Sequence, residues 1–477
     1  MIQNAIIIAI KPTNDAPDFD TLYGGETLIG RTLVAMSKSG MKYVTIICRM
    51  SDRTLIERCV KEVDAERISV SPTIYSMDDD VNLSKAVNEI TKSSESTWML
   101  MTYNKIIHPT FILPARECVQ TPALITYNGV MRQGDKVIFG EEMAPKFQTQ
   151  FQDVSIFEMV SVQDNKVKTW NTADAPHFSA GILVVRNTDI VLAETRQSIS
   201  ELIKFFIKKE LLKTVSVSNG WCMPVNKSIA SSVIKNVFWK MAFKEISGEF
   251  SKAVNSKLSK PLTFWFSAHQ YKPDTISNMS LVLFIVASGF LLIPEYWAMV
   301  VFAVVWQFSA GVLDRCDGEV ARMRNHESEA GGKFDMIVDD LRFALPLMAL
   351  GAACFLELPD VRYVIVAAIT LAGSFAITFF EQATMRRFGY VSRQKLNVDY
   401  LKAKGDTSRF SATMKKLQPV FKGDIRTFYV FLLTFLGEKT IIFWVLVFYH
   451  VFVSAVALFG ALTFPQLIKK IQSETKR

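Results

Sequence analysis

Eight residues between two apolar stretches of the chain have types and spacing suited to phosphate chemistry. The segment from Gly311 to Arg342 gives the pattern D-x2-D-G-x2-A-R-x8-G-x3-D-x3-D. The named positions are Asp314, Asp317, Gly318, Ala321, Arg322, Gly331, Asp335 and Asp339. Because apolar runs precede and follow the segment, we expect it at the end of a membrane helix. Four carboxylates there require an explanation, since ionisable groups at membrane depth are costly and by default indicate function.

Helical spacing would gather the four aspartates in one pocket. The first two are three residues apart and the last two are four apart, so each pair projects from one face of its own helix. Carboxylates brought that close repel one another unless a cation lies between them. Oxygen ligands favour Mg²⁺, Mn²⁺ or Ca²⁺, and two divalent ions sharing four aspartates suit phosphoryl transfer. Gly318 lets a ligand approach the backbone, and Arg322 on the same face can hold a diphosphate.

A structural alternative is that nearby arginines neutralise the aspartates in a salt-bridge network. The arginines in reach by sequence are Arg315, Arg322, Arg324 and Arg342. Eight residue types at fixed spacing favour a functional site over such a network.

The motif resembles the signature of the CDP-alcohol phosphotransferases and departs from it at none of the eight positions. The resemblance implies an enzyme in which an acceptor hydroxyl attacks the β-phosphorus of a CDP-alcohol and CMP leaves. It implies two Mg²⁺ or Mn²⁺ ions held by Asp314, Asp317, Asp335 and Asp339, with Asp339 also the general base. It also implies a homodimer. The residues implied in binding the CDP donor are Gly318, Ala321, Arg322, Ser328 and Gly331.

Length and composition are consistent with a membrane protein of several domains. The chain has 477 residues, which favours two or more domains. Its 54 Lys+Arg exceed its 46 Asp+Glu, and the positive charge clusters beside apolar runs, which favours a membrane surface over nucleic acid. The six cysteines form no C-x2-C pair, so we expect reduced thiols and no zinc site. The apolar run near Met1 is too short for a signal peptide and indicates a buried strand.

Residues 1–225 alternate strand and helix patterns, which predicts a Rossmann-like α/β domain with a mainly parallel sheet. The expected strands are Ala5–Ile10, Tyr43–Cys48, Thr97–Tyr103 and Ala180–Val185, and the expected helices include 27–39 and 199–213. The order of these pieces resembles a nucleotidyltransferase of the sugar-nucleotide type in degenerate form.

Departures from that resemblance predict that the domain does not activate CTP. Residues 11–20, KPTNDAPDFD, contain no glycine that would let backbone amides cradle phosphate. Tyr103 and Asn104 stand where the first metal aspartate is expected, and WCMPV near Trp221 stands where the second is expected. Without both carboxylates the hard ligands for Mg²⁺ are missing. We therefore expect a scaffold or regulatory domain. The alternative is a bifunctional enzyme whose N-terminal domain also makes the CDP donor.

Residues 226–272 mix aromatic residues and lysines at helical spacing. This pattern predicts a juxtamembrane helix in the plane of the lipid headgroups. The alternative is an amphipathic helix packed on a domain.

The apolar runs within residues 273–477 predict an all-α domain of six transmembrane helices. The expected spans are 276–293, 296–313, 336–356, 361–380, 425–436 and 441–464. The basic loop 386–422 and the basic tail indicate, by the positive-inside rule, that both termini and the motif face the cytoplasm. We therefore expect a multi-pass protein of the cytoplasmic (inner) membrane. Possible nucleotide, acceptor or headgroup contacts are Asp274, Ser277, Lys422, Asp424 and Arg426.

These patterns and the family resemblance predict an integral membrane transferase. It would move a substituted phosphate group from a CDP-alcohol to a hydroxyl acceptor in phospholipid biosynthesis. The expected donor is CDP-diacylglycerol, and the acceptor is inositol phosphate or another polyol. One alternative is a CDP-polyol transferase that makes a soluble phosphodiester. Others are an intramembrane prenyltransferase, which favours N-x3-D-x3-D patterns, and a non-catalytic membrane scaffold. No nucleic-acid partner is expected.

Overall fold

The chain, seen in a computed structural model, forms two compact units. The first contains Met1–Phe243, Ser267–Gln270 and Arg322–His326, and the second contains Lys244–Phe266, Tyr271–Ala321 and Glu327–Arg477. The structure describes all residues except 12–13, 64, 79–81, 93–95, 108, 118–120, 128–158, 165, 171–176, 194–195, 197, 218–221, 228–230, 244–250, 388–422 and 475–477.

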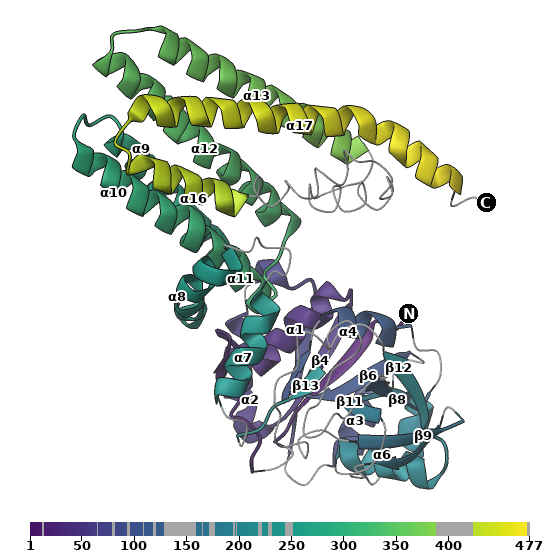
Figure 1. The fold of residues 1–477 in the computed structure, drawn as a ribbon. Helices are drawn as coiled ribbons and strands as arrows, with labels where there is room; N and C mark the ends of the chain where they lie inside the picture. The colour runs from purple at the N-terminus through teal and green to yellow at the C-terminus, as the bar shows by residue number, and fades with distance from the viewer. Residues whose placement is uncertain are drawn as a thin grey trace. The chain divides into compact units, whose positions relative to one another are not determined.

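The described part of the first unit is built on a nine-stranded sheet in the order β5-β4-β1-β6-β11-β8-β12-β10-β9 (Figure 1). Its strands are β1 (Asn4–Ala9), β4 (Tyr43–Arg49), β5 (Ser71–Met77), β6 (Thr97–Thr102), β8 (Ala123–Tyr127), β9 (Met159–Gln163), β10 (Lys166–Trp170), β11 (His177–Arg186) and β12 (Lys213–Val217). β5, β4, β1 and β6 run parallel, whereas β11 is antiparallel to both β6 and β8. The predicted α/β class is confirmed, and the sheet is mixed beyond β6.

Helices cover both faces of this sheet. α3 (Leu83–Thr91) and α6 (Ile199–Lys208) lie on the opposite side from α1 (Leu28–Lys38) and α4 (Pro109–Ala115) (Figure 1). The buried run of β1 supplies Ile6 and Ile8 to a core that also contains Leu202 and Phe206 of α6. Alternate strand residues point to opposite faces, so a strand covered on both sides is apolar throughout. α6 ends before the expected Lys213, and Glu210 just beyond it has a left-handed φ of 55°.

Shorter elements complete the first unit. They are β2 (Leu22–Tyr23), β3 (Glu26–Thr27), β7 (Lys105–Ile107), β13 (Cys222–Pro224), α2 (Arg53–Lys61), α5 (Asn187–Val191) and α7 (Ser231–Ala242).

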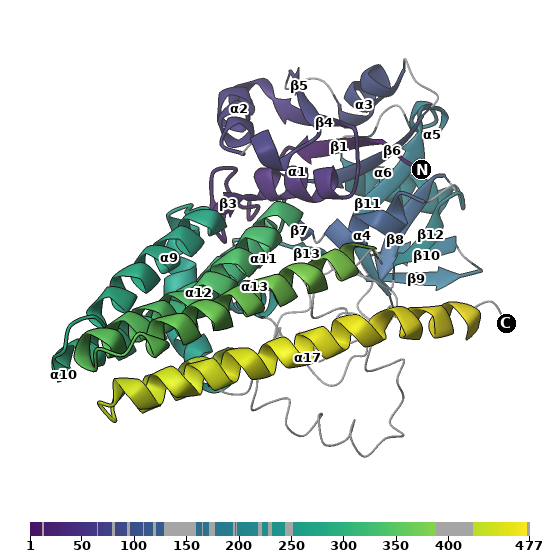
Figure 2. The same cartoon turned by 90° about the horizontal axis from the view of Figure 1, so that it is seen from above.

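The described part of the second unit is helical. Its elements are the π-helical segment η4 (Ser251–Asn255), α8 (Ser256–Ala268), α9 (Pro273–Phe290), α10 (Tyr296–Gln307), the π-helical segment η5 (Phe308–Leu313), α11 (Asp314–Met323), α12 (Glu329–Glu357), α13 (Arg362–Arg387), α16 (Gly423–Thr434) and α17 (Lys439–Glu474). α12, α13 and α17 run side by side (Figure 2). Together with α9 and α10 they form a core that contains Phe284, Trp306, Phe343, Leu347 and Phe443.

Four described segments are long and apolar enough to cross a membrane. They are Pro273–Phe290, Tyr296–Met323, Arg362–Thr384 and Lys439–Phe459. The helices that overlap the other two expected spans, α12 and α16, do not qualify. α12 begins with the charged residues of the motif, and α16 has only 12 residues where about 20 are needed. The protein is thus an integral membrane protein, and the expected count of six spans is not confirmed.

Residues 226–272 contain two helices in the described part rather than one. α7 belongs to the first unit, where its buried Phe238 ring lies 4.5 Å from the Arg31 guanidinium carbon. α8 turns Ser259 and Thr263 inward and leaves Leu258 and Trp265 exposed. α7 is therefore packed within the first unit, and the placement of residues 226–272 at the lipid headgroups stays a prediction.

Candidate active site

The aspartates of the motif converge in the second unit. α11 carries Asp314 and Asp317, and α12 carries Asp335 and Asp339. Carboxylate oxygens of Asp314, Asp317 and Asp335 lie within 4.8 Å of one another. Among the described residues, this is the one group of three or more acidic, histidine or cysteine side chains so arranged.

Local irregularity in the backbone sets the start of α11. The preceding helix widens into the π-helical η5, which shifts the direction in which the following side chains project. Ser309 of η5 donates a hydrogen bond to the Ser280 carbonyl of α9 at 2.8 Å. Gly311 packs closely against side-chain ends, since a Cβ there would lie 2.8 Å from the Gln307 amide nitrogen and 3.2 Å from the Asn255 amide. These contacts fix η5 against its neighbours and so orient Asp314 and Asp317.

Ser328 is the residue from which α12 begins. Its Oγ accepts a hydrogen bond from the Gly331 backbone N–H at 2.9 Å, as an N-cap does. A Cβ on Gly331 would lie 3.1 Å from Ser328 Oγ and 3.7 Å from Asp274 Oδ1. Asp274, in the first turn of α9, thus lies beside the start of α12. The observed contact of Ser328 is this helix cap.

Asp317 is 7% exposed and is held by two donors. Ser277 Oγ donates to one carboxylate oxygen at 2.5 Å, and the Gly318 backbone N–H donates to the other at 2.5 Å. Ser277 therefore belongs to the site and fixes the orientation of a motif aspartate.

Arg342 brings the fourth aspartate into the cluster. Its guanidinium bonds to Asp314 through Nη2 and lies 2.8 Å from Asp339 through Nη1. The Arg342 side chain is 7% exposed, and its guanidinium carbon lies 5.1 Å from the centre of the Phe284 ring. The Asp339 side chain is 51% exposed, which leaves it open to a second reactant.

The other three arginines have different observed partners. Arg315 pairs with Glu319 at 2.5 Å, and within the first unit Arg324 pairs with Glu26 at 3.3 Å. Arg322, also assigned to the first unit, donates from Nε to the Ala242 carbonyl at the end of α7 at 2.6 Å. Of the four arginines in the alternative salt-bridge network, Arg342 is thus seen paired with motif aspartates, those at 314 and 339. Ala321 lies half-buried on α11.

Sequence reasoning missed Glu319, which is fully buried on α11. Its carboxylate accepts hydrogen bonds from Thr263 at 2.6 Å, Ser259 at 3.2 Å and Arg315 Nε at 2.5 Å. Because Ser259 and Thr263 lie one turn apart on α8, Glu319 fastens α8 to the helix that carries two of the aspartates. The only signal in the sequence was the i,i+4 spacing of Arg315 and Glu319.

The donor set fits divalent cations. All candidate ligands are carboxylate oxygens, the ligands that Mg²⁺ and Mn²⁺ prefer, and carboxylates this close repel unless positive charge compensates them. Lys422 lies outside the described residues. Asp424 and Arg426 lie in the first turn of α16, and their side chains are not described.

The first unit has a second place where a ligand would be expected. In an open α/β sheet, ligands bind beyond the carboxyl ends of strands at the switch point, here β1 and β6. The fully buried Tyr103, just after β6, donates its hydroxyl to the Pro17 carbonyl, and its ring lies 4.6 Å from that of Phe19. Burial raises the pKa of Tyr103. The chain's own aromatic side chains thus occupy this position.

Two lysines at the same end of the sheet pair with the half-exposed carboxylate of Asp18. Asp18 accepts from Lys11 at 2.6 Å and from Lys227 at 3.3 Å, and these hydrogen bonds lower the pKa of Asp18. Trp221, at the expected second metal position, lies outside the described residues.

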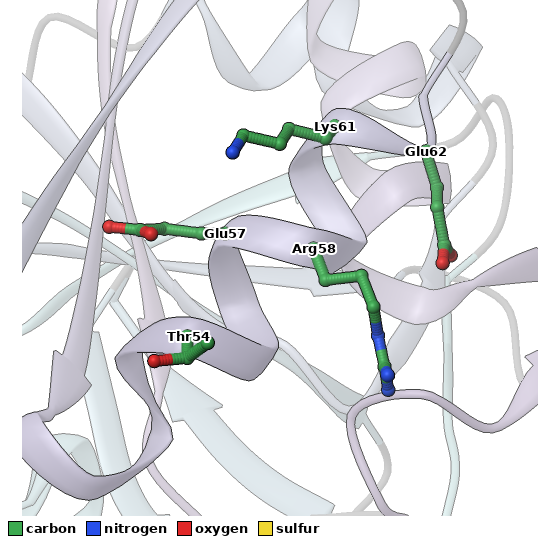
Figure 3. A pocket seen from close by; sticks show the side chains of 5 residues that line it. All are labelled: Thr54, Glu57, Arg58, Lys61 and Glu62. Carbon is green, nitrogen blue, oxygen red and sulfur yellow. The ribbon is translucent and has the colours of Figure 1, made fainter.

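A surface recess of about 340 Å³ lies along α2. Figure 3 shows the side chains that line it, which are Thr54, Glu57, Arg58, Lys61 and Glu62. Mixed charges exposed on one helix provide no evident chemistry.

The membrane helices and the gathered carboxylates are the features of a membrane-embedded phosphotransferase. Residues 271–462 match the family model described as CDP-alcohol phosphatidyltransferase. This C-terminal part of the chain is therefore a CDP-alcohol phosphatidyltransferase domain, and the protein is a CDP-alcohol phosphotransferase.

A curated relative covers both halves of the chain. It is the "Bifunctional IPC transferase and DIPP synthase" of Archaeoglobus fulgidus, 21% identical over 401 residues, which span 81% of this chain and 72% of the relative. Solved structures resemble about half of the chain. The inositol-1-phosphate CTP transferase from T. maritima has a TM-score of 0.37 and 13% identity, covering 50% of this chain and 95% of its own. HddC from Yersinia pseudotuberculosis has a TM-score of 0.35 and 9% identity, covering 47% and 93%.

Proposed function

We propose that this transferase uses two Mg²⁺ or Mn²⁺ ions held by Asp314, Asp317, Asp335 and Asp339. The observation that carries the proposal is the approach of three of these carboxylates to within 4.8 Å of one another. When bound, the ions would neutralise charge on the diphosphate, which together with positioning is most of what phosphoryl transfer requires.

Asp339 is proposed as the general base. Its carboxylate is half exposed, unlike that of the buried Asp317, so an acceptor hydroxyl can reach it and transfer its proton. Gly318 offers backbone on the donor side, and Arg322 offers a guanidinium fork for the diphosphate once it leaves the Ala242 carbonyl. Ala321 and Gly331 are also proposed to line the binding site of the CDP donor. Asp274, Asp424 and Arg426 are proposed to contact the nucleotide or acceptor, together with Lys422.

We propose a polyol or polyol phosphate as the acceptor. The relative is named a transferase and a synthase, which supports transfer of a group to an acceptor. A lipid donor such as CDP-diacylglycerol would give a phospholipid, whereas a CDP-polyol donor would give a water-soluble phosphodiester. Extraction of the product into an organic or an aqueous phase distinguishes these two donors.

We propose that the N-terminal domain does not activate CTP. The support is the position of Tyr103 and the pairing of Asp18 with Lys11 and Lys227 at the switch point. If the full-length protein released pyrophosphate from CTP with an alcohol phosphate, the bifunctional alternative would replace this proposal.

The membrane arrangement is also a proposal. Basic segments 386–422 and 469–477 support cytoplasmic termini and a cytoplasmic aspartate site, with six spans in all. A homodimer is proposed from the family resemblance alone. Cysteine accessibility from each side of sealed vesicles tests the orientation.

The central experiment measures CMP release by purified protein in detergent. CDP-diacylglycerol and CDP-polyols are each offered with inositol, inositol phosphate and other polyols. We expect Asp339→Asn to lower turnover by at least about a hundredfold, since general acid–base catalysis contributes 10²–10⁴-fold. Binding of the CDP donor should persist in this variant. Turnover within tenfold of wild type would remove Asp339 from the role of base.

A further inference from the structure

Arg342 occupies a position in the aspartate cluster that its family motif does not specify. It lies three residues after Asp339 on α12, and its guanidinium bridges to Asp314 on α11. The side chain is 7% exposed and lies beside the Phe284 ring. It is therefore a buried cation that joins the two helices which carry the aspartates.

Charge balance explains why a cation is needed there. Three carboxylates within 4.8 Å, with a fourth joined to them through Arg342, would repel strongly when ionised at neutral pH. A guanidinium has a fixed charge and a planar fork suited to two carboxylates at once. Arg342 reduces the repulsion by pairing with one aspartate from each helix, and both of these aspartates are proposed ligands of a divalent ion.

We propose that Arg342 is a built-in counter-cation of the aspartate site, which competes with divalent ions for Asp314 and Asp339 and thereby weakens ion binding. The inference rests on the proposed metal site. Arg342 holds α11 and α12 together before ions bind, and it gives way at these two carboxylates when ions arrive. Because divalent ions are bound more weakly, the fraction of sites that hold an ion varies with the ion concentration around the protein.

The test measures Mn²⁺ binding by calorimetry in detergent, with no substrate present. In Arg342→Gln the competing charge is absent, so we expect the Mn²⁺ dissociation constant to fall by about tenfold, given the strength of charge interactions at short range. The same variant should unfold at a lower temperature than wild type in EDTA, and saturating Mn²⁺ should remove most of that difference. A purely structural arginine would show the loss of stability with and without Mn²⁺.

Two further variants complete the experiment. Arg386→Gln removes one exposed positive charge from the end of α13 and should leave the Mn²⁺ dissociation constant unchanged. Arg342→Lys retains the positive charge but loses the planar guanidinium that pairs with two carboxylates at once. It should therefore compete less well and tighten Mn²⁺ binding by a few fold. This variant keeps the test decisive if Arg342→Gln does not fold.

The outcomes separate this inference from the proposed function. Equal or weaker Mn²⁺ binding by both Arg342 variants, with wild type binding Mn²⁺, would overturn the counter-cation role alone. A wild-type protein that binds no Mn²⁺ would instead refute the proposed metal site and this inference with it.

Discussion

Replacing Glu319 with alanine tests whether the attachment of α8 to α11 supports the aspartate site. Glu319 is fully buried, and Arg315, its partner at 2.5 Å, has a side chain only 9% exposed. The variant would leave the Arg315 guanidinium buried without this carboxylate. It would also remove the acceptor that lies 2.6 Å from the Thr263 hydroxyl.

The expected loss of stability follows from these contacts. Removing one partner of a buried ion pair costs about 3–5 kcal/mol, and a buried hydroxyl that loses its acceptor adds about 1 kcal/mol. The Ser259 hydroxyl loses less, because the Ser256 carbonyl lies 3.4 Å away as an alternative acceptor. Since helix α11 carries Asp314 and Asp317, the loss should also weaken Mn²⁺ binding.

Chemical unfolding in detergent, followed by tryptophan fluorescence, measures the change in stability. Glu319→Gln, which keeps an oxygen acceptor but loses the charge, should fall between wild type and Glu319→Ala. Lys168→Ala, which breaks an exposed pair with Glu210 in the first unit, is the control and should leave the unfolding midpoint unchanged. A change of less than about 1 kcal/mol in Glu319→Ala would show that the buried network does not stabilise the protein.

Two further predictions concern metal binding and pH. Asp314→Asn and Asp335→Asn should each weaken Mn²⁺ binding by about tenfold or more in calorimetry, since each removes a charged oxygen ligand; unchanged affinity would exclude that residue as a ligand. Burial alone would raise the pKa of Glu26, but Arg67 and the other nearby guanidinium groups outweigh it and hold the pKa below its ordinary 4.5. As pH falls, the unfolded chain binds the proton first, so the stabilisation from Glu26 is present above about pH 4.5 and is lost below it. Unfolding at pH 7 and pH 3 should therefore show Glu26→Gln less stable than wild type at pH 7, with a smaller difference at pH 3; an equal difference at both values would contradict the depressed pKa.

Local pattern was enough to predict much of the fold. The run Ala5–Ile10 reads as a buried strand because both faces of a covered sheet are apolar, and β1 follows at Asn4–Ala9. The end of α6 was placed too late, because a single left-handed residue, Glu210, ended a pattern that periodicity alone would continue. The number of membrane spans is harder to predict from the sequence. Charged residues on α12 and the short length of α16 keep these two helices from qualifying as spans by hydropathy and length.

The sequence by itself determined the chemistry of the site, because residue types at helical spacing specify which side chains share a face. It could not determine which charges pair, since pairing depends on how separate helices pack. Only the tertiary structure paired Arg342 of α12 with Asp314 of α11, whereas the pair of Arg315 and Glu319 lies within α11 at i,i+4 spacing. Only the fold, likewise, placed Tyr103 and Asp18 together at the end of the sheet, because residues far apart in the chain meet there by strand order.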